Sequence, residues 1–177
     1  VIPVAKHYPG HSNSAADPHI KLPSVSISKS EWDEYIYIFR YLIEKESVDM
    51  IMGGHLLFPK IDNKPSTISN VLINEKLRGE LGYDGVVITD DMQMAGIYRE
   101  GEECNTAIEA LNAGNDILLY TFYSPRKEIH TDVYNCVLDA TNNGSITQEE
   151  IDKKVLRILS LKIKYEIIDD TILNSLE

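Results

Sequence analysis

The sequence is poor in positive charge, poor in cysteine and without any long hydrophobic run. Its 17 lysines and arginines are outnumbered by 28 aspartates and glutamates, which gives a formal net charge of −11. Proteins that bind nucleic acid need clustered basic residues to neutralise phosphates, so nucleic acid is not an expected partner. No segment approaches the about 18 consecutive apolar residues of a transmembrane helix, and we therefore expect no membrane span.

Cysteine is limited to Cys104 and Cys136, which lie in segments with helical patterns and lack the spacing of a metal site. The plainest interpretation is a pair of buried thiols, which leaves the redox compartment open. The chain begins with Val1 rather than methionine, so either its N-terminus has been processed or it is a piece of a longer protein.

What the chain does contain is enough apolar material for the core of one domain, since 43% of its 177 residues are hydrophobic. Four short apolar runs are typical of strands buried on both faces of a parallel sheet: 2–5, 48–52, 86–89 and 117–120. Segments with helical periodicity follow them: 30–45, 69–81, 104–112, 128–140 and 147–164. The order β-α-β-α-β-α-β-α-α predicts an α/β fold, either half of an eight-stranded barrel or a small open sheet.

Helix-capping signals mark three of these boundaries. Ser30 is the predicted N-cap of the first helix, and Gly82 is the predicted stop of the second. Thr147 begins the last helix, where Glu150 completes the spacing of a capping box.

Polar, titratable residues follow the first strand. His7, His11 and His19 lie within a loop that also carries Lys6 and Asp17. The C-terminal ends of parallel strands are where α/β folds place their chemistry, so this loop is a candidate site. Asp17, two residues before His19, could hold that imidazole ring in one tautomer and stabilise its charged form.

A second polar group, Asp90 and Asp91, follows the third strand and is expected at the same rim of the sheet. One of the two carboxylates is expected to cap the turn that follows. The other is then available for catalysis.

A metal site is an alternative for the histidines. His7 and His11 stand four residues apart, and His19, Asp17 and His55 could complete a ligand set. Pro9 and Gly10 exclude the helical turn that places both rings of an HExxH motif on one face, although a loop could still bring them together. For His55, at the end of the second strand, the favoured interpretation is a hydrogen-bonded structural histidine.

Several motifs together resemble one family. They are Lys6-His7-Tyr8-Pro9-Gly10-His11, Asp17-Pro18-His19, Leu22-Pro23, Leu77-Arg78, the run Gly85 to Met94, Ala113-Gly114-Asn115-Asp116, Arg157-Ile158-Leu159 and Leu161-Lys162. In this order and register they are similar to the family 3 glycoside hydrolases, in the bacterial β-N-acetylglucosaminidase (β-hexosaminidase) branch. The first motif is highly specific, and the resemblance covers nearly the whole chain.

The resemblance implies a role for individual residues. Asp90 aligns with the nucleophile of a retaining glycosidase, His19 with the general acid/base and Asp17 with its dyad partner. Lys6, His7 and Met94 align with residues that bind the non-reducing N-acetylglucosamine. This chemistry needs one nucleophile and one proton shuttle, and the resemblance implies neither a metal nor a cofactor.

Two departures from the family pattern lie in the His-rich loop. Ser12-Asn13-Ser14 stands where the family has Gly-Asp-Thr, and Pro18 stands between the dyad residues where the family has serine.

The resemblance also implies that the chain is the second half of a (β/α)8 TIM-type barrel, strands five to eight with their helices. Half a barrel leaves edge strands and an apolar inner face uncovered. We therefore expect the chain to pair with another copy or with a missing N-terminal half, or to be marginally stable.

The expected partner is a carbohydrate, terminal β-N-acetylglucosamine of peptidoglycan-derived saccharides. Three alternatives remain open: another β-glycosidase of the family, a metal-dependent barrel hydrolase and a half-barrel that only binds sugar. Both the bacterial cytoplasm and the cell wall are compatible locations.

Overall fold

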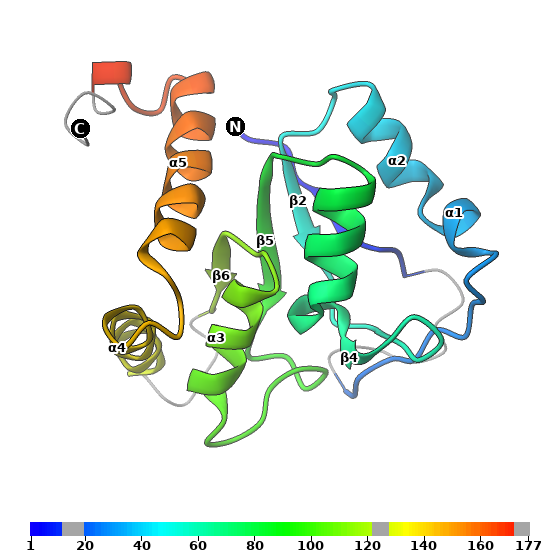
Figure 1. Cartoon of the computed structure of the whole chain (residues 1–177), viewed down its shortest axis with the longest axis horizontal. Coiled ribbons are helices and arrows are strands. Elements are labelled where there is room, and N and C mark those ends of the chain that lie inside the picture. The colour runs from blue at the N-terminus through cyan, green and yellow to red at the C-terminus, as the bar shows by residue number, and fades with distance from the viewer. Residues whose placement is uncertain (12–19, 122–127, 172–177) are drawn as a thin grey trace.

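The computed structural model describes residues 1–11, 20–121 and 128–171. Four parallel strands form one sheet in the order β1-β2-β5-β6: β1 is Ala5–Tyr8, β2 Met50–Gly53, β5 Val86–Asp91 and β6 Ile117–Leu119. A second, two-stranded antiparallel sheet joins β3 (Leu57–Phe58) to β4 (Asp62–Pro65). The predicted four βα units are thus confirmed (Figure 1).

Helices follow each strand of the larger sheet. They are α1 (Trp32–Tyr35), α2 (Tyr37–Glu44), the 3-10 turn η1 (Ser66–Ile68), η2 (Val71–Glu80), α3 (Glu103–Asn112), α4 (Ile129–Asn142) and α5 (Gln148–Lys164). The helix η2 has π-type hydrogen bonding, in which the N–H of Leu81 donates to the carbonyl of Lys76. No helix in the described ranges is both long and apolar enough to cross a membrane.

The sequence predicted most elements but misplaced several boundaries. The first strand runs over 5–8 rather than 2–5, because its pairing with β2 begins at Ala5 and continues through the polar Lys6 and His7. The helix expected over 30–45 is divided at Ile36. The β3–β4 hairpin was not predicted, because Leu57–Phe58 is too short to form a pattern and β4 is largely polar.

Ser30 is not the N-cap of the first helix, so that prediction was wrong. Glu31 precedes α1, and its carboxylate accepts hydrogen bonds from the backbone N–H (2.7 Å) and hydroxyl (2.6 Å) of Ser28. Ser28 and Glu31 have the spacing of a capping box, but only its carboxylate half forms, and no side-chain hydrogen bond caps α1. At α5 the prediction is confirmed, since the Thr147 hydroxyl accepts from the N–H of Glu150 at 3.2 Å.

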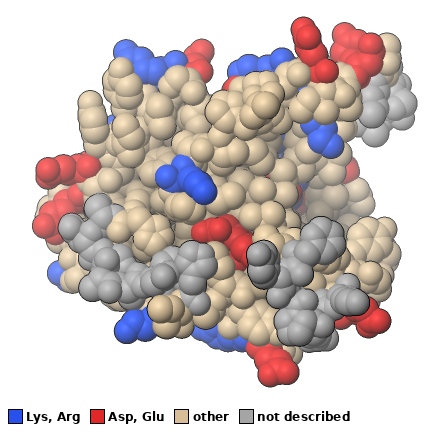
Figure 2. Space-filling view, turned by 180° about the vertical axis from the view of Figure 1, so that it is seen from behind, with Lys and Arg blue, Asp and Glu red and all other residues tan. Residues whose placement is uncertain are grey.

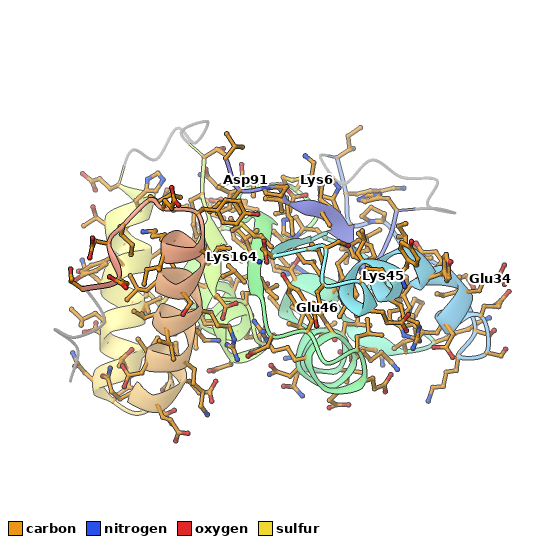
Figure 3. The ribbon with its side chains drawn as sticks, turned by 90° about the horizontal axis from the view of Figure 1, so that it is seen from above. Lys6, Glu34, Lys45, Glu46, Asp91 and Lys164 are labelled. Atoms are coloured by element: carbon orange, nitrogen blue, oxygen red, sulfur yellow. A yellow bond between two sulfur atoms is a disulfide. The ribbon has the colours of Figure 1, made fainter. Side chains whose placement is uncertain are left out.

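The two faces of the sheet are covered unequally. Ile51 and Val87 point to the face packed by η2 and α2, through side chains that include Leu77 and Phe39. Val86 and other alternate residues point to the opposite face, where α5 contributes the contacts. Figures 1 and 3 show η2 and α2 together on one side of the strands. Seen from behind, the other side presents mainly uncharged residues, with most charged groups around its outline (Figure 2).

A buried ion-pair network holds α5 at the N-terminal edge of the sheet. Asp116 directly precedes β6, and its carboxylate is inaccessible to solvent. It accepts hydrogen bonds from Arg78 of η2 (2.7 Å), from Arg157 of α5 (3.2 Å) and from the N–H of Val87 (2.8 Å). These partners offset part of the cost of burying the charges, although burial still lowers the pKa of the Arg78 guanidinium.

The two cysteines form a disulfide between α3 and α4, so the prediction of free buried thiols was wrong. They lie 32 residues apart in the sequence. The two helices pack against each other through Ala107, Ile129 and Val133. Only this packing, which no local pattern reveals, brings Cys104 and Cys136 together.

We expect reduction of this disulfide to destabilise the fold. Closing a loop of this length restricts the unfolded chain, and the loop-entropy relation gives about 3 to 4 kcal/mol. Urea unfolding monitored by circular dichroism, with and without reductant, measures the difference. A Cys104→Ser/Cys136→Ser double variant should unfold at the lower midpoint and should not respond to reductant. Equal midpoints for the oxidised and reduced wild type would contradict the prediction.

Candidate active site

The carboxylate of Asp90 lies at the C-terminal end of β5, the second strand from one edge of the sheet. Its side chain is 16% exposed, and its Oδ2 lies 3.6 Å from Nε2 of His7. Its Oδ1 accepts a hydrogen bond from the N–H of Asp91 at 2.9 Å. Asp90 therefore stands at the strand end, within reach of solvent, beside a histidine from β1.

The carboxylate of Asp91, unlike that of Asp90, makes hydrogen bonds to the turn after β5. Its carboxylate accepts hydrogen bonds from the N–H of Gln93 (3.0 Å) and from the hydroxyl of Thr121 (2.5 Å). These bonds fix the turn that follows β5 and connect it to the end of β6. The expected division of the acidic pair is thus present: Asp91 caps the turn, and Asp90 does not.

Lys6 and His7 reach the same rim from β1. In the sheet register Lys6 pairs with Met52, and Met52 pairs with Ile88, two residues before Asp90. Because side chains alternate along strands, Lys6 and Asp90 project to the same face. Figure 3 shows Lys6 and Asp91 on one side of the molecule, away from α2 and η2. The ring of His7 is 28% exposed and meets the ring of His11 edge to face at 5.7 Å.

The segment that carries these residues is anchored at several points. The Tyr8 hydroxyl, which is buried, donates to the carbonyl of Leu72 at 3.0 Å, and the Tyr35 hydroxyl donates to the carbonyl of Gly10 at 2.6 Å. A Cβ at Gly54 would lie 3.0 Å from the Cβ of His7, so a glycine is needed where β2 passes His7. The ends of β1 and β2 are consequently held close together.

Of the other three predicted site residues, the structure describes only Met94. Met94 lies in the turn after β5, half-buried, and its N–H donates to the carbonyl of Asp91 at 3.0 Å. Asp17 and His19 lie outside the described residues.

His55 is a buried structural histidine, as predicted. Its Nε2 lies 2.9 Å from the carbonyl oxygen of Asp91, and its Nδ1 lies 2.6 Å from Oγ1 of Thr67. Burial lowers the pKa of the imidazole, although the carbonyl of Asp91 and the nearby carboxylates of Asp90 and Asp91 oppose that shift. Thr67, which contacts His55, and Thr121, which contacts the carboxylate of Asp91, carry no signal in the sequence that could have identified them.

His55 is not available as a ligand in the alternative metal site, because both of its ring nitrogens take part in hydrogen bonds. Within the part of the chain that the structure describes, no three or more histidine, cysteine, aspartate or glutamate side chains gather in a group able to hold a metal ion.

A parallel βα array with a partly exposed carboxylate at the C-terminal end of a strand is the arrangement of an active site in a barrel enzyme. Comparison with known families identifies the class. Residues 1–161 match the glycosyl hydrolase family 3 N-terminal domain, and the chain belongs to this family. Its four βα units are those of a TIM-type barrel.

Individual relatives agree with this assignment. The chain is 37% identical over 120 residues to a β-hexosaminidase of Methylobacillus flagellatus, an alignment that covers 66% of this chain and 33% of the relative. It is 32% identical over 180 residues to β-hexosaminidase A of Pseudoalteromonas piscicida, covering 93% and 30%. A family 3 β-N-acetylglucosaminidase structure from a Paenibacillus species matches with a TM-score of 0.84 and 37% identity, covering 92% of this chain and 31% of that one. The chain thus spans about a third of the length of these relatives.

The lowered pKa of His55 predicts a pH-dependent stability. In the unfolded chain the histidine binds a proton near its ordinary pKa of 6.5, whereas the folded protein keeps it neutral to lower pH. Stability from this group is therefore complete above about pH 7 and declines as the pH falls through about 6.5. Urea unfolding of wild type and His55→Gln between about pH 8 and 5 should show the difference between them narrowing on acidification. A difference that stays constant over this range would contradict the prediction.

Proposed function

We propose that this chain supplies the nucleophile side of the active site of a retaining β-N-acetylglucosaminidase. Its substrates would be peptidoglycan-derived saccharides that end in β-linked N-acetylglucosamine. The observation that carries the proposal is the carboxylate of Asp90 at the end of β5, 3.6 Å from the imidazole of His7. The β-hexosaminidases and the β-N-acetylglucosaminidase to which the chain is similar support the same chemistry.

The first half of the reaction forms a covalent intermediate. A carboxylate oxygen of Asp90 attacks the anomeric carbon, the bond from that carbon to the leaving-group oxygen breaks, and His19 gives its proton to that oxygen. In the second half His19 takes a proton from water, which attacks the anomeric carbon and releases Asp90. Asp17 orients the imidazole of His19 and stabilises its charged form.

Sugar recognition in this proposal falls to the rim around Asp90. The exposed ammonium of Lys6 donates hydrogen bonds to sugar hydroxyls from the same sheet face as Asp90. His7 follows Lys6 in β1, and its imidazole lies beside the carboxylate of Asp90. From there it can contact both the sugar and the nucleophile. Met94 offers an apolar contact from the turn after β5.

Replacing the nucleophile should abolish turnover. In the natural gene product that contains these residues, we expect Asp90→Asn to lower kcat on 4-nitrophenyl N-acetyl-β-glucosaminide by about 10³-fold or more. Asp33→Asn removes an exposed carboxylate, 80% accessible and paired with Arg40, and serves as the matched control. Labelling with a 5-fluoro N-acetylglucosaminyl fluoride and peptide mass analysis should place the sugar on Asp90. A label on another residue, or normal turnover by Asp90→Asn, would reject the assignment.

We further propose that residues 1–177 form one domain, the C-terminal half of the family's catalytic barrel. The partly covered second sheet face and the one-third coverage of the relatives support this. Groups from other strands would then be needed to enclose the sugar.

The 177-residue chain alone should consequently hydrolyse the chromogenic substrate poorly or not at all. Initial rates for the purified chain, set beside those of the full-length Paenibacillus relative, test this directly. Turnover comparable to that relative, and lost in Asp90→Asn, would overturn the half-barrel proposal and leave the role of Asp90 intact.

A further inference from the structure

We propose that His55 is a positioning residue for the nucleophile. Together with Thr67, Asp91 and Thr121 it forms a set of hydrogen bonds, here called the β5 brace, that fixes the backbone at Asp91, directly after Asp90. The catalytic consequence of the brace rests on the proposed function of Asp90, whereas the brace itself rests on contacts in the structure.

The hydrogen bonds of His55 define its tautomer. A carbonyl oxygen can only accept, so Nε2 carries the proton and donates to the carbonyl of Asp91 at 2.9 Å. In the neutral ring Nδ1 is then an acceptor, and the Thr67 hydroxyl donates to it at 2.6 Å. His55 and Thr67 are both inaccessible to solvent, so water cannot replace either bond.

The Thr67 hydroxyl has a second acceptor beside it. It also donates toward the carbonyl of Gly54 at 2.9 Å, which accepts from the Ser66 hydroxyl at 2.5 Å as well, so the single Thr67 proton is shared between that carbonyl and Nδ1 of His55. The backbone of Thr67 is fixed as well, because its carbonyl accepts from the amide of Asn115 at 2.9 Å. The imidazole of His55 is thus fixed by its hydrogen bond with Thr67 of η1, and its other ring nitrogen fixes the backbone of β5 at Asp91.

The opposite side of β5 is fixed to β6. The Thr89 hydroxyl accepts from the N–H of Leu119 at 2.9 Å, and the carboxylate of Asp91 accepts from the Thr121 hydroxyl. Asp90 stands between these two residues, and its own Oδ1 accepts from the N–H of Asp91. The orientation of the nucleophile therefore depends on the Asp91 backbone, which His55 holds from the side of β2.

A nucleophile displaced by about 1 Å can lose about 10²-fold in rate, so such a brace has a measurable effect. Two substitutions of His55 separate its two bonds. The longer side chain of His55→Gln can place an amide N–H where Nε2 donates to Asp91. The shorter one of His55→Asn can reach Thr67 but stops short of the Asp91 carbonyl.

In the natural gene product, we expect kcat on 4-nitrophenyl N-acetyl-β-glucosaminide to fall about 100-fold in His55→Asn and about 10-fold or less in His55→Gln. KM should stay within about threefold in both, and their unfolding midpoints should be similar to each other. A merely structural histidine would make the two variants lose activity equally, or in proportion to their loss of stability, and either result would overturn the proposal.

A readout without catalysis separates the brace from the proposed function. In the 177-residue chain, the amide NMR signals of residues 90–92 should shift or broaden in His55→Asn and stay near their wild-type positions in His55→Gln. Signals unchanged in His55→Asn would overturn the brace even if Asp90 proves to be the nucleophile. A wild-type gene product inactive on the substrate, with the NMR pattern as expected, would reject the glycosidase proposal and retain the brace.

Discussion

Parallel pairing of β5 with its two neighbours is the interaction on which the rest of the structure depends. The register sets Gly53 of β2 beside Thr89, and Leu119 of β6 beside Asp91. Parallel strands bring all their carboxyl ends to one edge, and so the polar residues that follow β1, β2, β5 and β6 must meet there. A slip of one residue in β5 would turn the side chain of Asp90 to the other face of the sheet and away from His7.

The two ends of the parallel strands consequently carry different kinds of residues: paired buried charges at one end and the accessible carboxylate of Asp90 at the other. At the N-terminal edge, Asp116 with Arg78 and Arg157 ties η2 and α5 to the strands through buried, mutually satisfied charges. At the C-terminal edge, buried contacts of neutral His55 support Asp90, whose carboxylate remains partly exposed. The buried charges at one end of the strands are thus held by partners, whereas the carboxylate of Asp90 at the other end stays accessible to a ligand.

The sequence predicted those features that depend on local pattern. Apolar runs located β2, β5 and β6 and indicated β1 a few residues early, and the Thr147–Glu150 spacing located the start of α5. Features that depend on contacts between distant segments escaped it. The Cys104–Cys136 bridge depends on how α3 packs against α4, and the contact that holds the Asp91 carboxylate comes from Thr121, 30 residues away. His55 was recognisable as structural from its place after β2, but its partners Thr67 and Asp91 were not.

The open face of the sheet connects the fold to the chemistry. Residues on this face, such as Met52 and Ile88, are only partly buried, unlike Ile51 and Val87 on the face that the helices cover. In a closed barrel inward side chains fill the interior, and catalytic groups from several strands surround the substrate at one end. A rigid strand end can orient a carboxylate from one side, as the contacts around Asp90, the proposed nucleophile, do. Surrounding a sugar requires groups from the other side as well. In the proposed half-barrel, the same uncovered face that leaves Met52 and Ile88 accessible would leave the proposed sugar site half enclosed.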